Sequence, residues 1–305
     1  TDIDECSEHT LDLEIFPDRP DLLSGETLTR AMRPFLYGQQ AKPMLDIKKG
    51  TITMSVDPSL EHVRPIVMGA VVRNVNTGET HEDNEAFIKA LMDHQEKLHF
   101  ALGRGRKRAS IGVHDLATLV PPFTVTTAPG STQFTPLAMD EPMSIDSILT
   151  NHPKGIDYAH LLEGMEAYPV IMDANDAVLS FPPIINGNHT TVTSDTKDFF
   201  IDVTGWDPRA CEASLMLIAS QLEERGGEVE SVEITAYDGT VSDLPKAQPQ
   251  THTVTERLLN GLLGRALTDE EVQTAMNRMG GTYLGRSPVE NAPAREPENM
   301  ADVVD

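Results

Sequence analysis

One strong helical repeat, flanked closely by strand-like runs, constrains the fold more than any other feature of the sequence. Polar and apolar residues recur with a period near 3.6 between residues 87 and 102, and acidic residues lie near the expected start of this helix. Short apolar runs at residues 52–56, 66–75 and 109–113 lie on either side, separated by Pro and Gly. Helix and strands so close together predict a fold that mixes α and β structure, of the α+β class.

The rest of the chain repeats both patterns. Residues 11–16 alternate like a half-buried strand, and prolines then break the run before a helix at about residues 26–36. Asp207-Pro208 supplies an N-cap and a first helical position, so we expect a helix from there to Arg225. Further strand-like segments are predicted at residues 169–179, 184–193, 199–203 and 229–237.

The last sixty residues differ in character. Residues 242–253 are polar, contain two prolines and are typical of a linker. Two short helices follow, the second opened by a Thr268–Glu271 capping box and ended by Gly280-Gly281. Because these helices carry few cations, we interpret the pair as a packing module and expect no DNA partner. Residues 287–305 show no periodicity and are expected to form a loop.

The charge of the chain bears on its partners. It has 48 acidic and 24 basic residues, a net charge of -24, which ordinarily disfavours nucleic acid. The acids are dispersed and aromatic residues make up only 5%, a composition that suits a halophilic protein. At molar salt the Debye length falls to roughly 3 Å, so the surface charge does not exclude an RNA partner. An ordinary acidic surface adapted for solubility is the simpler interpretation.

Compartment and cofactor classes are also limited by composition. The two cysteines, Cys6 and Cys211, are too far apart in sequence to suggest a disulfide framework or a zinc cluster. No apolar run approaches the roughly 20 residues that cross a bilayer, so no membrane partner is expected. The acidic start is the reverse of a signal peptide. These features predict a cytoplasmic protein with no metal site in these residues.

Three segments resemble the β subunit of archaeal and eukaryotic phenylalanine–tRNA ligases. The first is residues 16–24 (Phe-Pro-Asp-Arg-Pro-Asp-Leu-Leu-Ser), although the family usually has Asn in place of Asp18. The second comprises residues 95–99 (Gln-Glu-Lys-Leu-His), 111–116 (Ile-Gly-Val-His-Asp-Leu) and 121–124 (Pro-Pro-Phe-Thr), with a basic tract between the first two. The third comprises residues 180–186 (Ser-Phe-Pro-Pro-Ile-Ile-Asn) and 200–205 (Phe-Ile-Asp-Val-Thr-Gly), which line the family's editing module.

This resemblance implies a domain organisation and partners. Residues 1–43 correspond to the end of an N-terminal domain, 44–245 to the editing module, and 246–305 to an incomplete helical, winged-helix-like domain. The implied enzyme is an α₂β₂ heterotetramer that binds tRNA(Phe), with the aminoacylation site in the α subunit. The resemblance implies ATP and Mg²⁺ as cofactors of that whole enzyme. The Mg²⁺ ligands of β would follow Asp305, so none is expected to be bound in this part.

The editing module would hydrolyse tRNA mischarged with tyrosine. An apolar phenylalanine pocket rejects an added hydroxyl only about a hundredfold, so a second, hydrolytic site supplies the missing selectivity. Asp202 and Thr204 are two apart and share one face of a strand, where a carboxylate and a hydroxyl are presented together. Ser180, held extended by the prolines that follow, is directed to the same cleft. These three are the candidate catalytic residues, with Asn186 and the apolar Ile171 as candidate substrate contacts.

Alternatives stay open for these residues. Asp202 could instead cap the turn after its strand, and no Ser-His-Asp order or carboxylate pair identifies a general base, so a positioned water is the expected nucleophile. His99, His114 and Asp115 do not suggest a metal trio, because His114 and Asp115 point to opposite faces of a strand, and a packing role is expected for them. His189 is interpreted as a structural loop residue.

The densest cationic cluster is residues 104–108 (Arg-Gly-Arg-Lys-Arg). Arg104, Arg106, Lys107 and Arg108 are candidate contacts to tRNA phosphates, or they could pair with acids of this chain or of the α subunit. Two other functions are kept beside editing. The chain could be a non-catalytic scaffold that binds tRNA and the α subunit, or a free-standing trans-editing hydrolase, which the resemblance of the flanking segments disfavours.

Overall fold

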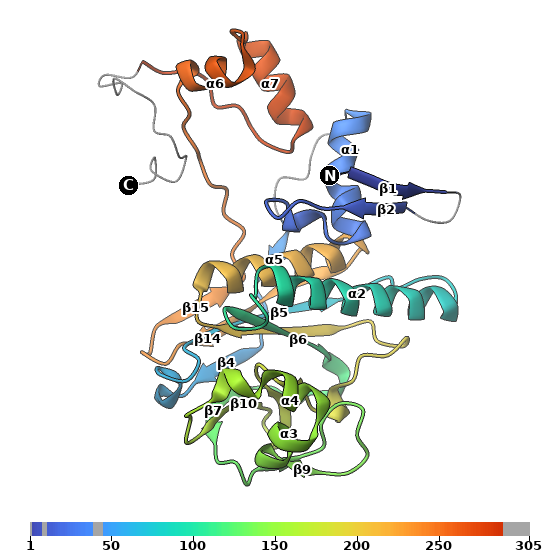
Figure 1. Ribbon diagram of the computed structural model, residues 1–305, viewed down its shortest axis with the longest axis vertical. Coiled ribbons are helices and arrows are strands. Elements are labelled where there is room, and N and C mark those ends of the chain that lie inside the picture. The colour runs from blue at the N-terminus through green and yellow to red at the C-terminus, as the bar shows by residue number, and fades with distance from the viewer. Residues whose placement is uncertain (1, 8–10, 39–44, 289–305) are drawn as a thin grey trace. The chain divides into compact units, whose positions relative to one another are not determined.

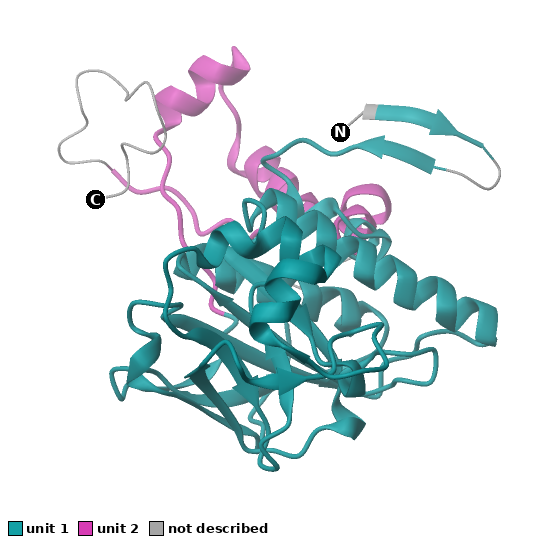
Figure 2. Ribbon diagram, turned by 60° about the horizontal axis from the view of Figure 1, so that its bottom comes forward, with its two compact units in different colours: residues 1–29, 45–247 teal, residues 30–44, 248–305 magenta. Residues whose placement is uncertain are grey.

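The structure is a computed structural model, and it describes residues 2–7, 11–38 and 45–288. Contacts divide the chain into two compact units, residues 1–29 with 45–247 and residues 30–44 with 248–305 (Figure 2). The first unit contains the large sheet and all the candidate site residues. The three-domain division remains a prediction.

The first unit is built on one mixed sheet (Figure 1). Its strands are, in spatial order, β12 (Ile185–Asn186), β11 (Val178–Phe181), β10 (Tyr168–Met172), β7 (Phe123–Ala128), β4 (Thr53–Val56), β14 (Glu228–Thr235), β5 (Ile66–Arg73), β13 (Phe199–Gly205) and β6 (Ala109–Asp115). Two further strands, β3 (Ile47–Lys48) and β15 (Val241–Leu244), pair with β14. β4 runs parallel to its neighbours β7 and β14, whereas β13 is antiparallel to both β5 and β6.

The remaining strands form two small hairpins, and the helices complete the fold. The hairpins pair β1 (Asp2–Cys6) with β2 (Leu11–Glu14) and β8 (Gln133–Phe134) with β9 (Met143–Ser144). The helices are α1 (Gly25–Tyr37), α2 (His81–Ala101), α3 (Ile145–Asn151), α4 (Pro153–Tyr158), α5 (Pro208–Glu224), α6 (Glu256–Leu263) and α7 (Asp269–Arg278). This confirms the predicted α+β class and the helical character of the C-terminal segment.

Side-chain caps fix the starts of the two long helices. Thr80 accepts a hydrogen bond from the backbone of Asp83 at 3.1 Å, and the Asp83 carboxylate accepts from the backbone of Thr80 at 3.0 Å, so α2 begins with a capping box. The Asp207 carboxylate accepts from two backbone N–H groups of α5, as the Asp-Pro pair predicts. Thr268 and Glu271 form the predicted capping box of α7.

Strand β13 separates two parts of the core. Its odd-numbered residues, including Ile201 and Val203, are fully buried in the cluster that contains side chains of α2 and α5, which lie side by side over this face (Figure 1). Its even-numbered residues face the other way, where the Phe200 and Phe123 rings lie 4.5 Å apart between centroids. The candidate residues Asp202 and Thr204 share this second face, as the alternation predicts.

Three segments differ from the predicted elements because of turn chemistry. Residues 169–179 are not one strand but a hairpin, since the Asp173 carboxylate accepts from the N–H groups of Asn175 and Ala177 and bends the chain. In residues 184–193 only β12 is extended, and a 3-10 turn follows it. The predicted linker 242–253 begins instead with β15, paired to β14. Most of the predicted loop 287–305 lies outside the described residues.

Within the described residues, no helix is long and apolar enough to cross a bilayer.

Candidate functional site: a pocket beside the edge strand

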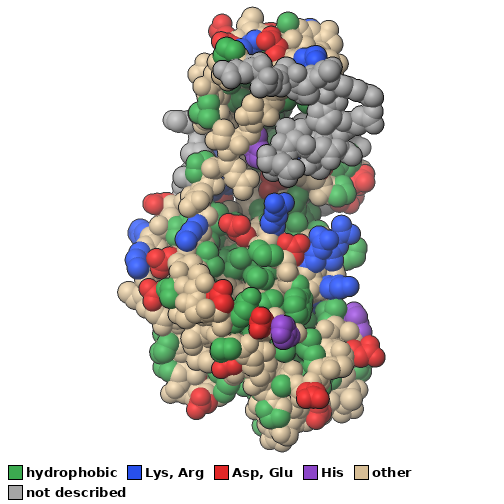
Figure 3. All heavy atoms as spheres, turned by 90° about the vertical axis from the view of Figure 1, so that its left-hand side faces the viewer, with side chains coloured by type: hydrophobic (Ala, Val, Ile, Leu, Met, Phe, Trp, Pro, Cys, Tyr) green, Lys and Arg blue, Asp and Glu red, His purple; other side chains and the backbone are tan. Residues whose placement is uncertain are grey.

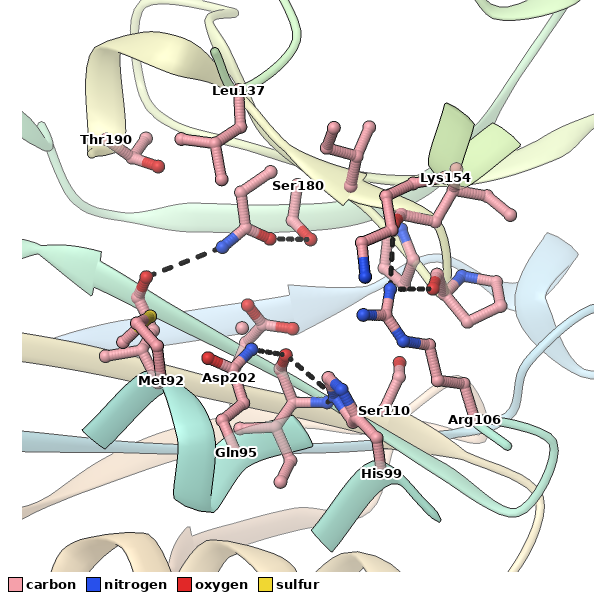
Figure 4. Close-up of a pocket in the computed structure, with 18 of the residues that line it drawn as sticks. Met92, Gln95, His99, Arg106, Ser110, Leu137, Lys154, Ser180, Thr190 and Asp202 are labelled. Atoms are coloured by element: carbon pink, nitrogen blue, oxygen red, sulfur yellow. Dashed lines mark hydrogen bonds between the residues drawn. The ribbon is translucent and has the colours of Figure 1, made fainter. Parts of the chain in front are cut away.

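A pocket of about 360 Å³ lies beside β6 (Figure 4). One wall comes from the last turns of α2, another from β6, and a third from β11, β12 and the prolines between them. The lining is completed by Asp202 of β13, residues 190–192, Arg106, Leu137 and Lys154. Cavities of this size hold small organic groups, so the pocket is a candidate ligand site.

β6 is the last strand of the sheet, so no strand pairs with its outer edge. Side chains rather than another strand meet the outer backbone groups of β6. The Gln95 amide donates to the Ile111 carbonyl at 2.7 Å, and the Ile111 N–H donates to His99 Nε2 at 2.8 Å. The Asn186 amide donates to the Val113 carbonyl at 3.4 Å. The walls from α2 and β12 are thereby fixed to β6.

Asp202 lines the pocket and is 1% exposed. Its Oδ2 is 2.7 Å from Nε2 of His114, whose Nδ1 is 2.8 Å from the hydroxyl of Thr190. That hydroxyl in turn donates to the carbonyl of Gly187 at 2.9 Å. His114 thus links the Asp202 carboxylate on β13 to the Thr190 hydroxyl in the turn after β12.

A glycine makes this pair possible. Gly112 lies directly opposite Asp202 on β6, and a Cβ at that position would come 2.0 Å from Asp202 Oδ2 and 2.7 Å from His114 Nε2. On the other side, Gly69 of β5 also lies opposite Asp202, but a Cβ there would meet nothing closer than 3.4 Å. Only Gly112 therefore leaves the space that the carboxylate occupies.

Ser180 and Asn186 line the same pocket as Asp202, as predicted for Ser180. The Ser180 hydroxyl donates to the Asn186 side-chain oxygen at 3.3 Å, and the two residues are paired across β11 and β12. Figure 4 shows Ser180 above Asp202, on a strand that forms another wall of the pocket. Three of the five candidate catalytic and substrate residues thus lie around one cavity.

Thr204 and Ile171 are placed elsewhere. The Thr204 hydroxyl accepts from Arg64 Nε at 2.7 Å and lies 3.1 Å from the Ser110 hydroxyl, and Thr204 is not part of the pocket lining. Burial lowers the pKa of the Arg64 guanidinium to about 10. Ile171 is fully buried in the apolar cluster that holds Phe123 and Leu179.

The basic tract is divided between the interior and the surface. Arg106 is 6% exposed, lines the pocket, and donates to the carbonyl of Ile184 at 2.9 Å and to Glu96 at 2.6 Å, while its guanidinium lies 4.4 Å from the centre of the Tyr158 ring. Of the four candidate phosphate contacts, Arg106 is thus buried, while Arg104, Lys107 and Arg108 are exposed.

Glu96 is surrounded by basic side chains at the pocket. A hydrogen bond from His99, followed by the charges of Arg106 and Lys154, lowers the pKa of Glu96 to about 2. Burial lowers the pKa of His99. His99 is thus neutral at pH 7, in agreement with the N–H that its Nε2 accepts.

His114, Gln95 and Glu96 were not predicted as site residues. The clue for His114 is Gly112, because a glycine within an apolar strand marks a close approach by another group. Gln95 and Glu96 belong to a segment that carries the family resemblance, but their roles depend on which edge of the sheet α2 meets. Within the described residues, no three His, Cys, Asp or Glu side chains are grouped as metal ligands, and the absence of a metal site remains a prediction.

Comparison with known proteins identifies the family. Residues 63–240 match the model of the B3/4 domain. The phenylalanine–tRNA ligase beta subunit of Methanococcoides burtonii is 42% identical over 91% of this chain and 50% of its own length, and that of Methanosarcina acetivorans is 43% identical over 99% and 54%. The chain spans about half the length of these curated relatives.

A solved structure gives the same result. The crystal structure of an N-terminal fragment of the phenylalanyl-tRNA synthetase beta subunit from Pyrococcus horikoshii superposes with a TM-score of 0.83 at 32% identity. It covers 91% of this chain, and the chain covers 80% of that fragment. The sequence resemblance is thereby confirmed, and the chain belongs to the family of phenylalanine–tRNA ligase beta subunits, of which it carries the B3/4 domain.

Proposed function

We propose that the pocket beside β6 is an editing site that hydrolyses tyrosine from mischarged tRNA(Phe). The observation that carries the proposal is the buried carboxylate of Asp202, which His114 holds beside a largely apolar cavity that also presents the short polar side chains of Ser180 and Asn186. A buried charge with a specific partner in a cleft is typical of functional sites. A phenylalanine-specific ligase also needs such a site, because its synthetic pocket rejects tyrosine weakly.

Asp202 is the residue that orients the reacting groups. Its Oδ2 is occupied by His114, and among the described residues no group hydrogen-bonds its Oδ1. Oδ1 is therefore available to accept a hydrogen bond from a water molecule near the ester carbonyl. The water oxygen bonds to the carbonyl carbon, the bond to the ribose oxygen breaks, and that oxygen leaves as a hydroxyl. The products are tyrosine and uncharged tRNA.

Ser180 and Asn186 bind the substrate from another wall of the pocket. Their hydroxyl and amide groups are polar partners for the tyrosyl hydroxyl or the α-ammonium group, and phenylalanine lacks the first of these. Thr204 acts through the position of β13 and Ile171 through the packing of β10, since neither lines the pocket. The selectivity is thus assigned to β11 and β12.

The wider assembly belongs to the same proposal. The tRNA binds through Arg104, Lys107 and Arg108, and the chain is part of a cytoplasmic α₂β₂ ligase with an α subunit. ATP and Mg²⁺ serve aminoacylation in that whole enzyme. The donor groups of a metal site do not come together in the described residues, so no step of the proposed hydrolysis is routed through either cofactor.

The test is hydrolysis of tyrosyl-tRNA(Phe) by the protein and by Asp202→Ala, with phenylalanyl-tRNA(Phe) as the substrate control. We expect selective loss of tyrosine that falls at least about a hundredfold in the variant, the scale of a lost catalytic group. Asp195→Asn, an exposed carboxylate in a loop, is the matched protein control. Retained tRNA binding without hydrolysis would instead favour the non-catalytic scaffold.

A further inference from the structure

We propose that the junction of β13 with α5 binds unpaired RNA nucleotides, with Trp206 as the surface on which a base stacks. This inference rests on the proposed function and assigns a path for the single-stranded 3′ end of the tRNA. The surface consists of residues 206–209 and the exposed cations of the basic tract.

The two segments are held together by backbone contacts. The N–H of Trp206 donates to the carbonyl of Arg108 at 2.9 Å, and the N–H of Asp207 lies 3.3 Å from the same oxygen. A Cβ on Gly205 would come 2.0 Å from that carbonyl, so only glycine permits the approach. Trp206 is thereby fixed beside the end of the basic tract.

The Trp206 side chain has the properties of a stacking surface. It is 48% exposed, and in the described part of the chain it contacts no other aromatic ring and no cation. It is the sole tryptophan of the chain, and about half of this large side chain faces solvent. Exposed aromatic rings beside cations are what single-stranded RNA sites use, because each base has a face that stacks.

The charge of this surface is opposite to that of the protein. Residues 104–108 and 206–209 expose four cations, Arg104, Lys107, Arg108 and Arg209. The acid among them, Asp207, accepts two N–H groups of α5 and lies 3.6 Å from Arg108. Figure 3 shows that basic side chains gather in a band across the middle of the face it draws, with acidic ones between them. Phosphates are favoured there despite the net charge of -24.

The backbone explains how one tract serves both the pocket and the surface. Arg104, Gly105 and Arg106 have φ values of 51°, 64° and 65°, a left-handed turn that L-residues rarely adopt. This turn directs Arg106 into the pocket wall and leaves Arg104 and Lys107 on the surface. Strained backbone of this kind is retained where it places a functional group.

The distance between pocket and surface suits a short run of nucleotides. Asp202 and Trp206 are four residues apart at the end of β13, about 13 Å along an extended chain. Stacked nucleotides advance about 3.4 Å each, so about four of them cover this span. An ester at the 3′ end could lie at Asp202 while a preceding base stacks on Trp206.

The sole tryptophan makes the proposal directly measurable. A single-stranded RNA ending in the 3′-CCA of tRNA is titrated into the protein while Trp206 fluorescence is recorded, with a blunt RNA duplex of the same length as the control. We expect saturable quenching by the single strand only, weakening with salt. Trp206→Ala should reduce affinity for the same labelled RNA about tenfold by anisotropy, and Trp206→Phe should restore most of it.

Charge variants distinguish RNA binding at this surface from a general electrostatic attraction of RNA to the protein. Lys107→Glu should weaken binding of the single strand. Lys89→Glu should not, because Lys89 is an exposed residue of α2 that lies about 18 Å before the end of that helix. Quenching without any tyrosyl-tRNA hydrolysis would support this surface and count only against the editing site. Hydrolysis without quenching, or equal effects of Lys107→Glu and Lys89→Glu, would overturn it, as would equal binding of single strand and duplex.

Discussion

The two polar positions of β13 have similar burial and different surroundings. Asp202 and Thr204 are both 1% exposed, point to the same face of the same strand, and each contacts a basic side chain. Asp202 nevertheless borders a cavity, because Gly112 leaves room beside it, whereas Thr204 is enclosed by Arg64 and Ser110. Which face a residue occupies follows from alternation, but access to that residue is decided by its cross-strand neighbours.

The difference between Asp202 and Thr204 should depend most strongly on Gly112. Gly112→Ala places a Cβ 2.0 Å from Asp202 Oδ2, so we expect the carboxylate to be displaced from His114 and tyrosyl-tRNA hydrolysis to fall about a hundredfold. Gly69→Ala is the matched control, since its Cβ meets only ordinary contacts on the other side of Asp202. Both variants are assayed in single turnover, and equal effects would mean that the space beside Asp202 has no role.

Removal of His114 tests whether Asp202 acts alone. His114→Gln keeps a donor but not the fixed ring, so we expect hydrolysis to fall about tenfold and unfolding free energy to drop by about 1–3 kcal/mol. Hydrolysis that is unchanged in this variant would mean that Asp202 acts without His114.

Thr204 should affect stability more than hydrolysis. Thr204→Val keeps the shape of the side chain but leaves Arg64 Nε without its acceptor, which should lower the unfolding free energy by about 1–3 kcal/mol. Hydrolysis should change less than about threefold in single turnover, measured well below the melting temperature. Thr53→Val, an exposed threonine of β4, should leave both quantities unchanged. A loss of hydrolysis as large as that of Asp202→Ala would place Thr204 in the reaction itself.

The smallest expected effect is a gradual loss of stability in acid, because two histidines are buried in their neutral form. Burial lowers the pKa of His99 and of His94, so the unfolded chain binds protons near pH 6.5 and the folded chain does not. Their contribution is complete above pH 6.5 and is lost as pH falls below it. Thermal melts from pH 8 to pH 5 should show this decline, and a flat profile would contradict neutral burial of these rings.

Much of the fold follows from the sequence because local rules were obeyed. The caps of α5 and α7, the helical repeat of α2 and the alternation in β13 all agree with the structure. The hairpin at Asp173 differs from the prediction because one carboxylate accepting two N–H groups turns a run that is otherwise apolar. Alternation alone did not reveal it.

The site was predictable only in part, for a related reason. Grouping Ser180 with Asp202 needed the family resemblance, since 22 residues along the chain and six strand pairings across the sheet separate them. The pairing of His114 with Asp202 depends on the register of β6 against β13, which local sequence does not specify. The interior position of Arg106 depends on a left-handed turn that a composition-based interpretation of the basic tract does not predict.

The side chains that cover the outer edge of β6 have a consequence for colloidal behaviour. An uncovered terminal strand offers a template on which a second molecule can add its own strand, and aggregation follows. The outer backbone groups of β6 that an added strand would need are already hydrogen-bonded to Gln95, His99 and Asn186. The residues that shape the pocket therefore also protect this edge against aggregation. Variants that enlarge the pocket at these three positions are expected to be less soluble.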